Sequence, residues 1–350
     1  MKNITKIGLS ALAGTLALTS ANAGDLSLSG SMEASYTTGG GYTTTGNPLG
    51  MDKELSITGS GELDNGMAIS YKQTSSDALA FNDSEIKVDT GSFGTIALTS
   101  TGSPISAIDD VTPTAFEEAN ALLGSIDDVN GSDGTYGIRY TYSDILGSGM
   151  KADVMYFPKH GAGDANADNS SSGDSAGDDA WEYTLTGSLA MLPGLSFGAG
   201  YVDLTKDLDQ VGTSDDIGQD EGTAYLKYAY GPLTVGAQIG VIGFDKKTTT
   251  SDESFIDWYK NTFYGASYAV NDNLTISYQM NKSQQHTRLD GNTIVDGSHG
   301  SSVEQESDGF SVAYTLGGMT IAYVDNSHDN EGYNDGTSKD YRQVVLGVAF

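Results

Sequence analysis

The chain has 350 residues and a formal net charge of −30, with 46 glycines, 20 tyrosines and no cysteine. The lack of cysteine excludes disulfides and thiolate-ligated metals. The acidic charge argues against nucleic-acid binding, which needs clustered Lys and Arg. Acidic chains of low hydrophobicity are often disordered, but the regular spacing of the tyrosines speaks against disorder here.

Residues 1–23 have the layout of a secretory signal peptide. Lys2 and Lys6 form a basic start, a short apolar run follows, and an Ala-Asn-Ala cleavage site precedes Gly24. The sequence therefore predicts export and a mature chain of residues 24–350. The apolar run is too short for a membrane-spanning helix, and no later stretch reaches about 18 consecutive apolar residues.

The dominant period in the mature chain is two, which predicts strands with one apolar and one polar face. For example, Ile138, Tyr140 and Tyr142 alternate with Arg139 and Thr141. Sixteen strands are expected at about 25–37, 52–63, 66–74, 83–89, 93–100, 135–144, 150–157, 181–191, 195–204, 222–230, 233–244, 258–270, 274–282, 306–316, 319–326 and 340–350.

Short and long connections alternate strictly between these strands. The short ones are rich in Gly, Asn and Pro, which suits tight hairpins. The long ones are acidic or rich in Gly and Ser, and lie at about 38–51, 75–82, 101–134, 158–180, 205–221, 245–257, 283–305 and 327–339. An up-and-down barrel with turns at one end and loops at the other explains this order, as in outer-membrane barrels.

A soluble sandwich or a solenoid would also show period two. A sandwich would have loops of similar length at both ends, and a solenoid would repeat a consensus. A sixteen-stranded barrel is too wide for side chains to fill, so its polar face must line a wet interior and its apolar face must meet lipid. Tyrosines that share the apolar parity or sit at strand ends suit aromatic belts, although strand propensity explains some of them.

The last ten residues alternate apolar and polar side chains and end on Phe350. This ending resembles the C-terminal signal by which the barrel-assembly machinery recognises outer-membrane barrels. With the signal peptide, the start at Gly24-Asp25-Leu26 and the loop rhythm, the chain resembles the Gram-negative general porin family, including its α-proteobacterial branch. The resemblance implies a sixteen-stranded all-β antiparallel transmembrane barrel, a homotrimer, and a third loop that folds into the pore.

The third long connection, 101–134, is the longest, and a loop of this length needs a function or structure of its own. Thr112 as cap, Pro113 in the first turn and Gly124 at the end predict a short helix. Its apolar face is expected to lie on the barrel wall, with its acids pointing elsewhere. That face comprises Phe116, Ala119, Leu122 and Leu123.

The resemblance places this loop at the pore constriction, although the enterobacterial Pro-Glu-Phe-Gly-Gly pattern is absent and residues 113–117 are only a loose analogue. The candidate constriction acids are Asp109, Asp110, Glu117, Glu118, Asp127 and Asp128. Porins of this family oppose the loop with basic wall residues, and inward parity here gives Lys72, Lys87, Arg139 and Lys151. Ordinary lumen charges and ion pairs explain these residues equally well.

The acidic balance predicts a mild preference for cations, because rings of Asp and Glu concentrate cations in a pore. Ca²⁺ or Mg²⁺ can bridge the acidic loops loosely, but no metal site is assigned. Residues 164–168 begin like a calcium loop and lack the later Gly and Glu. Surface hydration is the alternative role of these acids.

No enzymatic site is expected. Gly194-Leu195-Ser196-Phe197-Gly198 matches a nucleophile elbow, but it lies in an alternating strand rather than between a strand and a helix. The four histidines fall in long loops without metal-ligand spacing. The function predicted is an outer-membrane pore for small hydrophilic solutes and ions, surrounded by outer-membrane lipid and lipopolysaccharide. The alternative is a barrel receptor, adhesin or anchor whose acidic loops bind a ligand.

Overall fold

The computed structural model describes residues 14–16, 25–39, 47–75, 81–121, 126, 128–132, 136–159, 179–206, 217–244, 254–289 and 299–350. All sixteen predicted strands are present. They are β2 (Leu26–Thr38), β3 (Leu49–Glu62), β4 (Ala68–Ser75), β5 (Phe81–Asp89), β6 (Thr95–Thr99), β7 (Gly137–Tyr142), β8 (Lys151–Phe157), β9 (Ala180–Ser188), β10 (Leu195–Lys206), β11 (Ile217–Tyr230), β12 (Leu233–Phe244), β13 (Ser254–Ala269), β14 (Leu274–Leu289), β15 (His299–Leu316), β16 (Met319–Asp329) and β17 (Ser338–Ala349). Within these described ranges, no helix is long and apolar enough to cross a membrane.

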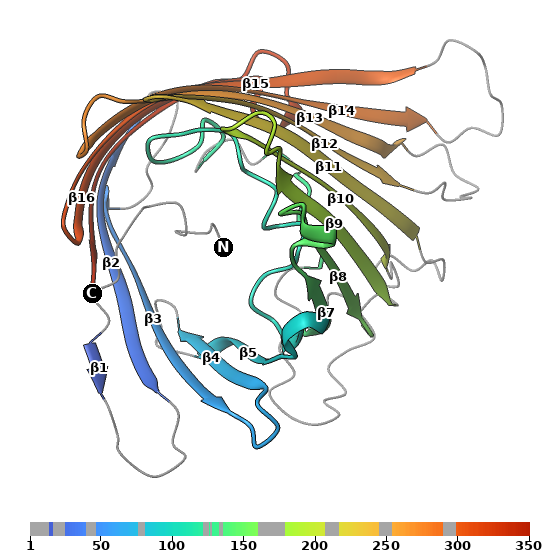
Figure 1. Ribbon diagram of the computed structural model, residues 1–350. Helices are drawn as coiled ribbons and strands as arrows, with labels where there is room; N and C mark the ends of the chain where they lie inside the picture. The colour runs from blue at the N-terminus through green and yellow to red at the C-terminus, as the bar shows by residue number, and fades with distance from the viewer. Residues whose placement is uncertain are drawn as a thin grey trace.

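The strands form one closed antiparallel ring (Figure 1). Each strand pairs with the next in sequence, and β17 pairs with β2, so that Val344 lies opposite Tyr36. Closure leaves no unpaired sheet edge, which is the condition for strands to stand in lipid. The predicted sixteen-stranded up-and-down barrel is confirmed.

A three-residue strand, β1 (Gly14–Leu16), pairs with the start of β2 and adds no strand to the ring. The rest of 1–23 lies outside the described residues. The signal peptide therefore stays a prediction.

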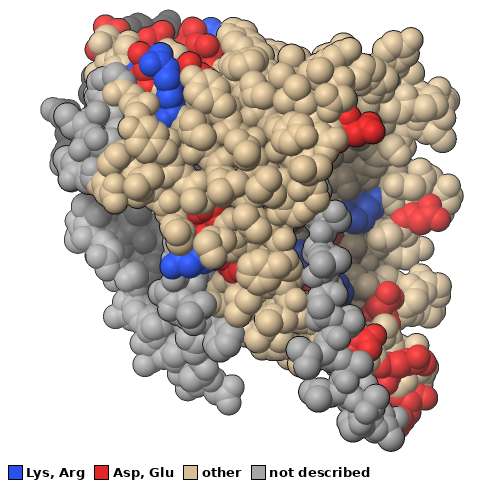
Figure 2. Space-filling model, turned by 90° about the vertical axis from the view of Figure 1, so that its left-hand side faces the viewer, with Lys and Arg blue, Asp and Glu red and all other residues tan. Residues whose placement is uncertain are grey.

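Apolar side chains point outward along the strands. On β17, Val344, Leu346 and Val348 are each more than 40% exposed, whereas Val345 and Gly347 between them are buried. Exposing such a row to water would be unfavourable, but lipid is as apolar as the side chains. Figure 2 shows a broad surface of uncharged side chains, with the charged ones gathered mainly around its edges.

Outward aromatic side chains mark the limits of this apolar surface. Near the turns, the exposed tyrosines include Tyr71, Tyr142, Tyr230, Tyr268 and Tyr314. Farther along the strands, the hydroxyls of Tyr201 and Tyr323 donate to the outward carboxylates of Asp220 and Asp325. The apolar surface therefore gives way to charge at these pairs, as expected at the headgroup boundary.

The last residue of the chain lies beside the first half of β2, at the turn side of the barrel. Phe350 and Gly30 exchange two backbone hydrogen bonds, with N···O distances of 2.9 and 3.0 Å. A Cβ atom on Gly30 would lie 2.9 Å from the Phe350 ring. Glycine at this position therefore gives the terminal aromatic ring its place on the outer wall.

The height of the wall differs around the ring. β6 and β7 have five and six residues, whereas β13, β14 and β15 have 16 to 18. The long strands continue into stretches predicted as loops, so the predicted connection 283–305 is shorter than expected. Beyond the membrane both faces of a strand meet water, and the apolar alternation that identifies a strand disappears.

Candidate functional site

The connection between β6 and β7 lies inside the barrel, where Figure 1 shows it as a teal trace within the ring. We call its described parts, 100–121, 126, 128–132 and 136, the constriction loop. The predicted helix is wrong for residues 112–121, which form none; Leu122, Leu123 and Gly124 lie outside the described residues. The backbone amides of Val111, Ala115 and Ala119 donate to wall side chains instead of to one another. This binding to the wall replaces the helical hydrogen bonds.

Apolar side chains fix the loop to the inner wall at two places. Ile105, Ile108 and Val129 pack in a buried cluster with wall residues of β8 to β13. At the far end, Ala115 and Phe116 pack against a small cluster on β15, β16 and β17, whose members are Ala313, Ala322 and Val345. The predicted placement of Phe116 on the wall is confirmed.

Inward-facing glycines let the loop backbone approach the sheet. A Cβ on Gly265 would lie 2.7 Å from the Pro113 carbonyl oxygen, and one on Gly236 would lie 2.7 Å from Pro113 Cδ. On β15, a Cβ on Gly309 would lie 3.0 Å from Ala119 Cα. We call Gly236, Gly265 and Gly309 the glycine seat, because larger residues there would displace the loop.

Two buried glutamines beside the glycine seat, Gln238 and Gln279, join the loop to the wall. Gln279 accepts a hydrogen bond from Ala119 N at 2.9 Å and donates to the carbonyl oxygen of Thr112 at 3.1 Å. Gln238 accepts from Val111 N at 3.1 Å and donates to Asp109 Oδ1 at 3.0 Å. Each amide uses both its donor and its acceptor, so the loop is held in one register.

Two buried glutamates hold the part of the loop that returns to β7. Glu182 accepts hydrogen bonds from Ser132 N at 2.8 Å and Ile105 N at 3.4 Å. Glu221 accepts from Gly131 N at 2.8 Å and Asn130 N at 3.0 Å. Sequence reasoning missed both glutamates, because their inward parity is the only signal that the sequence carries.

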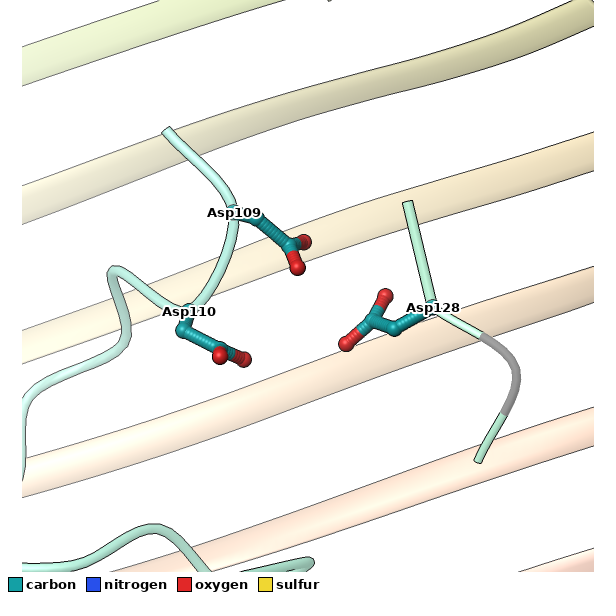
Figure 3. A group of neighbouring side chains, drawn as sticks. All are labelled: Asp109, Asp110 and Asp128. Atoms are coloured by element: carbon teal, nitrogen blue, oxygen red, sulfur yellow. The ribbon is translucent and has the colours of Figure 1, made fainter. Parts of the chain in front are cut away.

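Asp109, Asp110 and Asp128 bring three carboxylates together, with oxygens within 4.8 Å of one another. Figure 3 shows them converging from two separate stretches of the loop. Asp128 also accepts hydrogen bonds from Val129 N and Asn261 Nδ2, but burial and the nearby Asp110 charge raise its pKa well above the usual range. Carboxylates this close can share protons or hold a hard cation such as Ca²⁺. Asp127 lies outside the described residues.

Glu117 and Glu118 are half-buried at the far end of the loop. Glu117 and Asp52 are close enough to Glu33 on β2 for their charges to repel it. The carbonyl oxygen of Glu118 accepts a hydrogen bond from Asn326 Nδ2 at 3.0 Å. The loop therefore presents Glu117 toward an acidic part of the wall.

The four predicted basic residues lie on β4, β5, β7 and β8, and three of them pair with wall carboxylates. Arg139 and Lys87 reach Glu85 at 2.9 and 3.6 Å, and Lys151 reaches Asp153 at 2.8 Å. Lys72 lies opposite Glu85 in the β4–β5 register. These wall carboxylates reduce the positive charge that the basic side chains offer to the lumen.

A closed barrel with an apolar exterior, a polar interior and a loop fixed inside it has the architecture of a membrane channel. Residues 8–335 match the family model described as Gram-negative porin. The chain therefore belongs to the Gram-negative porin family, and it is a non-enzymatic channel of the outer membrane. No curated protein sequence matches it.

Solved structures show the same fold at low sequence identity. OmpT of Vibrio cholerae, folded in vitro, is similar with a TM-score of 0.67 and 14% identity over 95% of this chain and 99% of that one. OmpF of Salmonella typhi, in complex with daunomycin, gives 0.61 and 16% over 93% and 98%. A mutant of Rh. blastica porin gives 0.54 and 16% over 93% and 100%. A trimer form of the Vibrio cholerae protein has a TM-score of 0.59 at 12% identity, over 94% of this chain and 100% of that one.

Proposed function

We propose that the chain forms a water-filled pore through which small hydrophilic solutes and ions cross the outer membrane by passive diffusion. The observation that carries this proposal is the attachment of the constriction loop along one side of the wall. Its hydrogen bonds to the wall include those with Glu182 on β9 and Asn326 on β16, and its apolar contacts run from β8 to β17. A loop bound along the wall narrows a barrel without crossing it as a plug would.

A mild preference for cations follows from the charges at the far end of the loop. Glu117, Glu33 and Asp52 are electrostatic neighbours there, whereas Arg139 and Lys151 have carboxylate partners. Acidic groups around a narrow passage raise the local concentration of cations. The predicted field between an acidic loop and a basic wall stays a proposal, since Glu85 and Asp153 weaken its basic side.

The test is conductance of the refolded protein in a planar bilayer under a salt gradient. We expect stepwise openings and a reversal potential that favours cations. Glu117→Gln and Glu33→Gln should each move the reversal potential toward zero, and Glu306→Gln, on the outer face beside Lys282, should not. Folded, inserted protein that never conducts would contradict the pore and favour the receptor, adhesin or anchor.

We also infer that further copies of the chain cover the side of the barrel where the wall is lowest, at β6 and β7. A strand needs about 9–11 residues to cross the apolar layer, but β6 and β7 have five and six. Lipid at this side would contact the residues beyond the ends of β6 and β7, whose backbone groups are not paired in the sheet. A homotrimer with this face toward its centre would remove that contact, whereas the taller β13–β15 side would face outer-membrane lipid and lipopolysaccharide.

A further inference from the structure

We propose that the last external connection, residues 330–337, is a second constriction element, with Tyr333 as the positioning residue that holds it inside the barrel mouth. The inference rests on the proposed pore function. It concerns a different segment from the constriction loop, and it gives the pore an additional size limit on its external side.

The connection leaves β16 and folds across the inner face of two other strands. Gly332 N donates to Gln305 Oε1 on β15 at 2.9 Å, and the Tyr333 hydroxyl shares a hydrogen bond with Ser283 Oγ on β14 at 2.7 Å. Gln305 and Ser283 are 1% and 0% exposed, and they share the inward parity of the buried polar residues on their strands. The segment therefore lies within the mouth of the barrel.

The Tyr333 ring extends this attachment to a third strand and, through Tyr259, to a fourth. Its centroid lies 5.5 Å from that of Tyr259 on β13, which in turn meets Phe244 on β12 at 6.2 Å. Tyr259 belongs to the buried cluster that also contains Val129 of the constriction loop. Two residues farther along β13, on the same inner face, Asn261 donates to Asp128 of that loop. Tyr333 is thus packed on the external side of the wall patch that holds the constriction loop.

The backbone of the connection is consistent with a fixed inward conformation. Asn330 and Tyr333 have φ of 56° and 58°, a left-handed conformation that is uncommon for a bulky side chain. Such a conformation persists where the surroundings determine it. Here the surroundings are the contacts of Tyr333 with Ser283 and Tyr259 and the salt bridge between Lys339 and Glu331. These contacts hold the left-handed conformation in place.

The position of the segment decides which side of the mouth it narrows. It covers the lumen over β13, β14 and β15, the tall side of the barrel. Solutes entering from outside then pass on the opposite side of the ring, over β5 to β7. The segment is therefore expected to exclude bulky solutes before they reach the constriction loop, and to affect small ions less.

The experiment uses the full-length barrel in liposomes, with swelling rates measured for uncharged sugars from monosaccharide to trisaccharide. Tyr333→Ala removes one hydrogen bond and the ring packing, so the ratio of docked to undocked segment should fall roughly tenfold or more. We expect the trisaccharide-to-monosaccharide rate ratio to rise. Tyr333→Phe keeps the ring and should have a smaller effect, and Asp335→Ala, at an exposed position of the same segment, should match the wild type.

A second variant keeps the proposal falsifiable if Tyr333→Ala inserts poorly. Replacing residues 331–336 with Asn-Gly gives a tight hairpin in place of the inward segment, and it should raise the rate ratio at least as much. An unchanged ratio in this variant, in barrels whose folding is verified by heat-dependent gel mobility, would overturn the second constriction. Failure of the proposed function would look different, because then wild-type liposomes would admit no sugar at all.

Discussion

Replacing Gln279 should release the middle of the constriction loop without harming the barrel. Gln279 is 2% exposed and bonds to Ala119 N, to both oxygens of Thr112 and, at 3.4 Å, to the carbonyl oxygen of Pro113. The amide nitrogen has two hydrogens for these three acceptors and therefore makes about two full hydrogen bonds, and the amide oxygen accepts one more from Ala119 N. Replacing the side chain thus removes about three hydrogen bonds, each worth about 0.5–1.5 kcal/mol net. Docking should weaken by about 3 kcal/mol, and the ratio of docked to undocked loop should fall roughly a hundredfold.

The assay is single-channel recording of Gln279→Met, which keeps the side-chain volume and removes the hydrogen bonds. We expect larger open-channel current fluctuations and a higher mean conductance, because the loop spends more time away from its place on the wall. Gln284→Ala is the matched control, since Gln284 has the opposite parity on the same strand. Wild-type noise and conductance in both Gln279→Met and Gln279→Ala would refute the idea that this side chain holds the loop.

Four further results are expected. Gly265→Ala should displace Pro113 and raise channel noise, whereas Gly347→Ala, whose Cβ would meet no atom within 4 Å, should not. Glu221→Gln replaces one carboxylate oxygen with an NH₂ group, which cannot accept hydrogen bonds from the backbone amides of Asn130 and Gly131. The free energy of unfolding, measured by thermal denaturation, should fall by about 1–3 kcal/mol. Because burial and Asp110 raise the pKa of Asp128, docking of the loop is strongest at and below the ordinary carboxyl pKa and weakens as pH rises through the raised value. Current noise should therefore grow with pH, and Asp128→Asn should reduce this dependence. Phe350→Ala should lower the fraction of protein that reaches the outer membrane, measured by fractionation, if the terminal ring is the insertion signal.

The barrel could be predicted from the sequence because its determinants are local. Each strand shows its period within about ten residues, and each turn shows its Gly, Asn or Pro. The loop at 101–134 was also evident from its length. The helix at 112–124 was predicted wrongly over its described part because the local signals of Thr112 and Pro113 are sound, but the wall at Ser277 and Gln279 competes for the same backbone groups.

The attachment of the loop could not be predicted, because it depends on which residues of distant strands lie side by side. Glu182, Glu221 and Gln279 look in the sequence like any other inward polar residue. Only the register between strands brings them to one surface. The glycine seat left a weak signal, since Gly236, Gly265 and Gly309 all have inward parity on β12, β13 and β15, but many glycines in this chain share that parity.

The reach of the constriction loop across the wall has a consequence for the order of folding. Glu118 bonds to Asn326, 208 residues farther along the chain, and contacts so distant in sequence form late, because the chain between them must be ordered first. The loop has no complete docking surface until β16 is in place. A nascent barrel should therefore pass through a stage in which the strands are paired but the constriction loop is not yet docked, so that the pore is wide. The permeability of the membrane then depends on how quickly loop docking follows insertion.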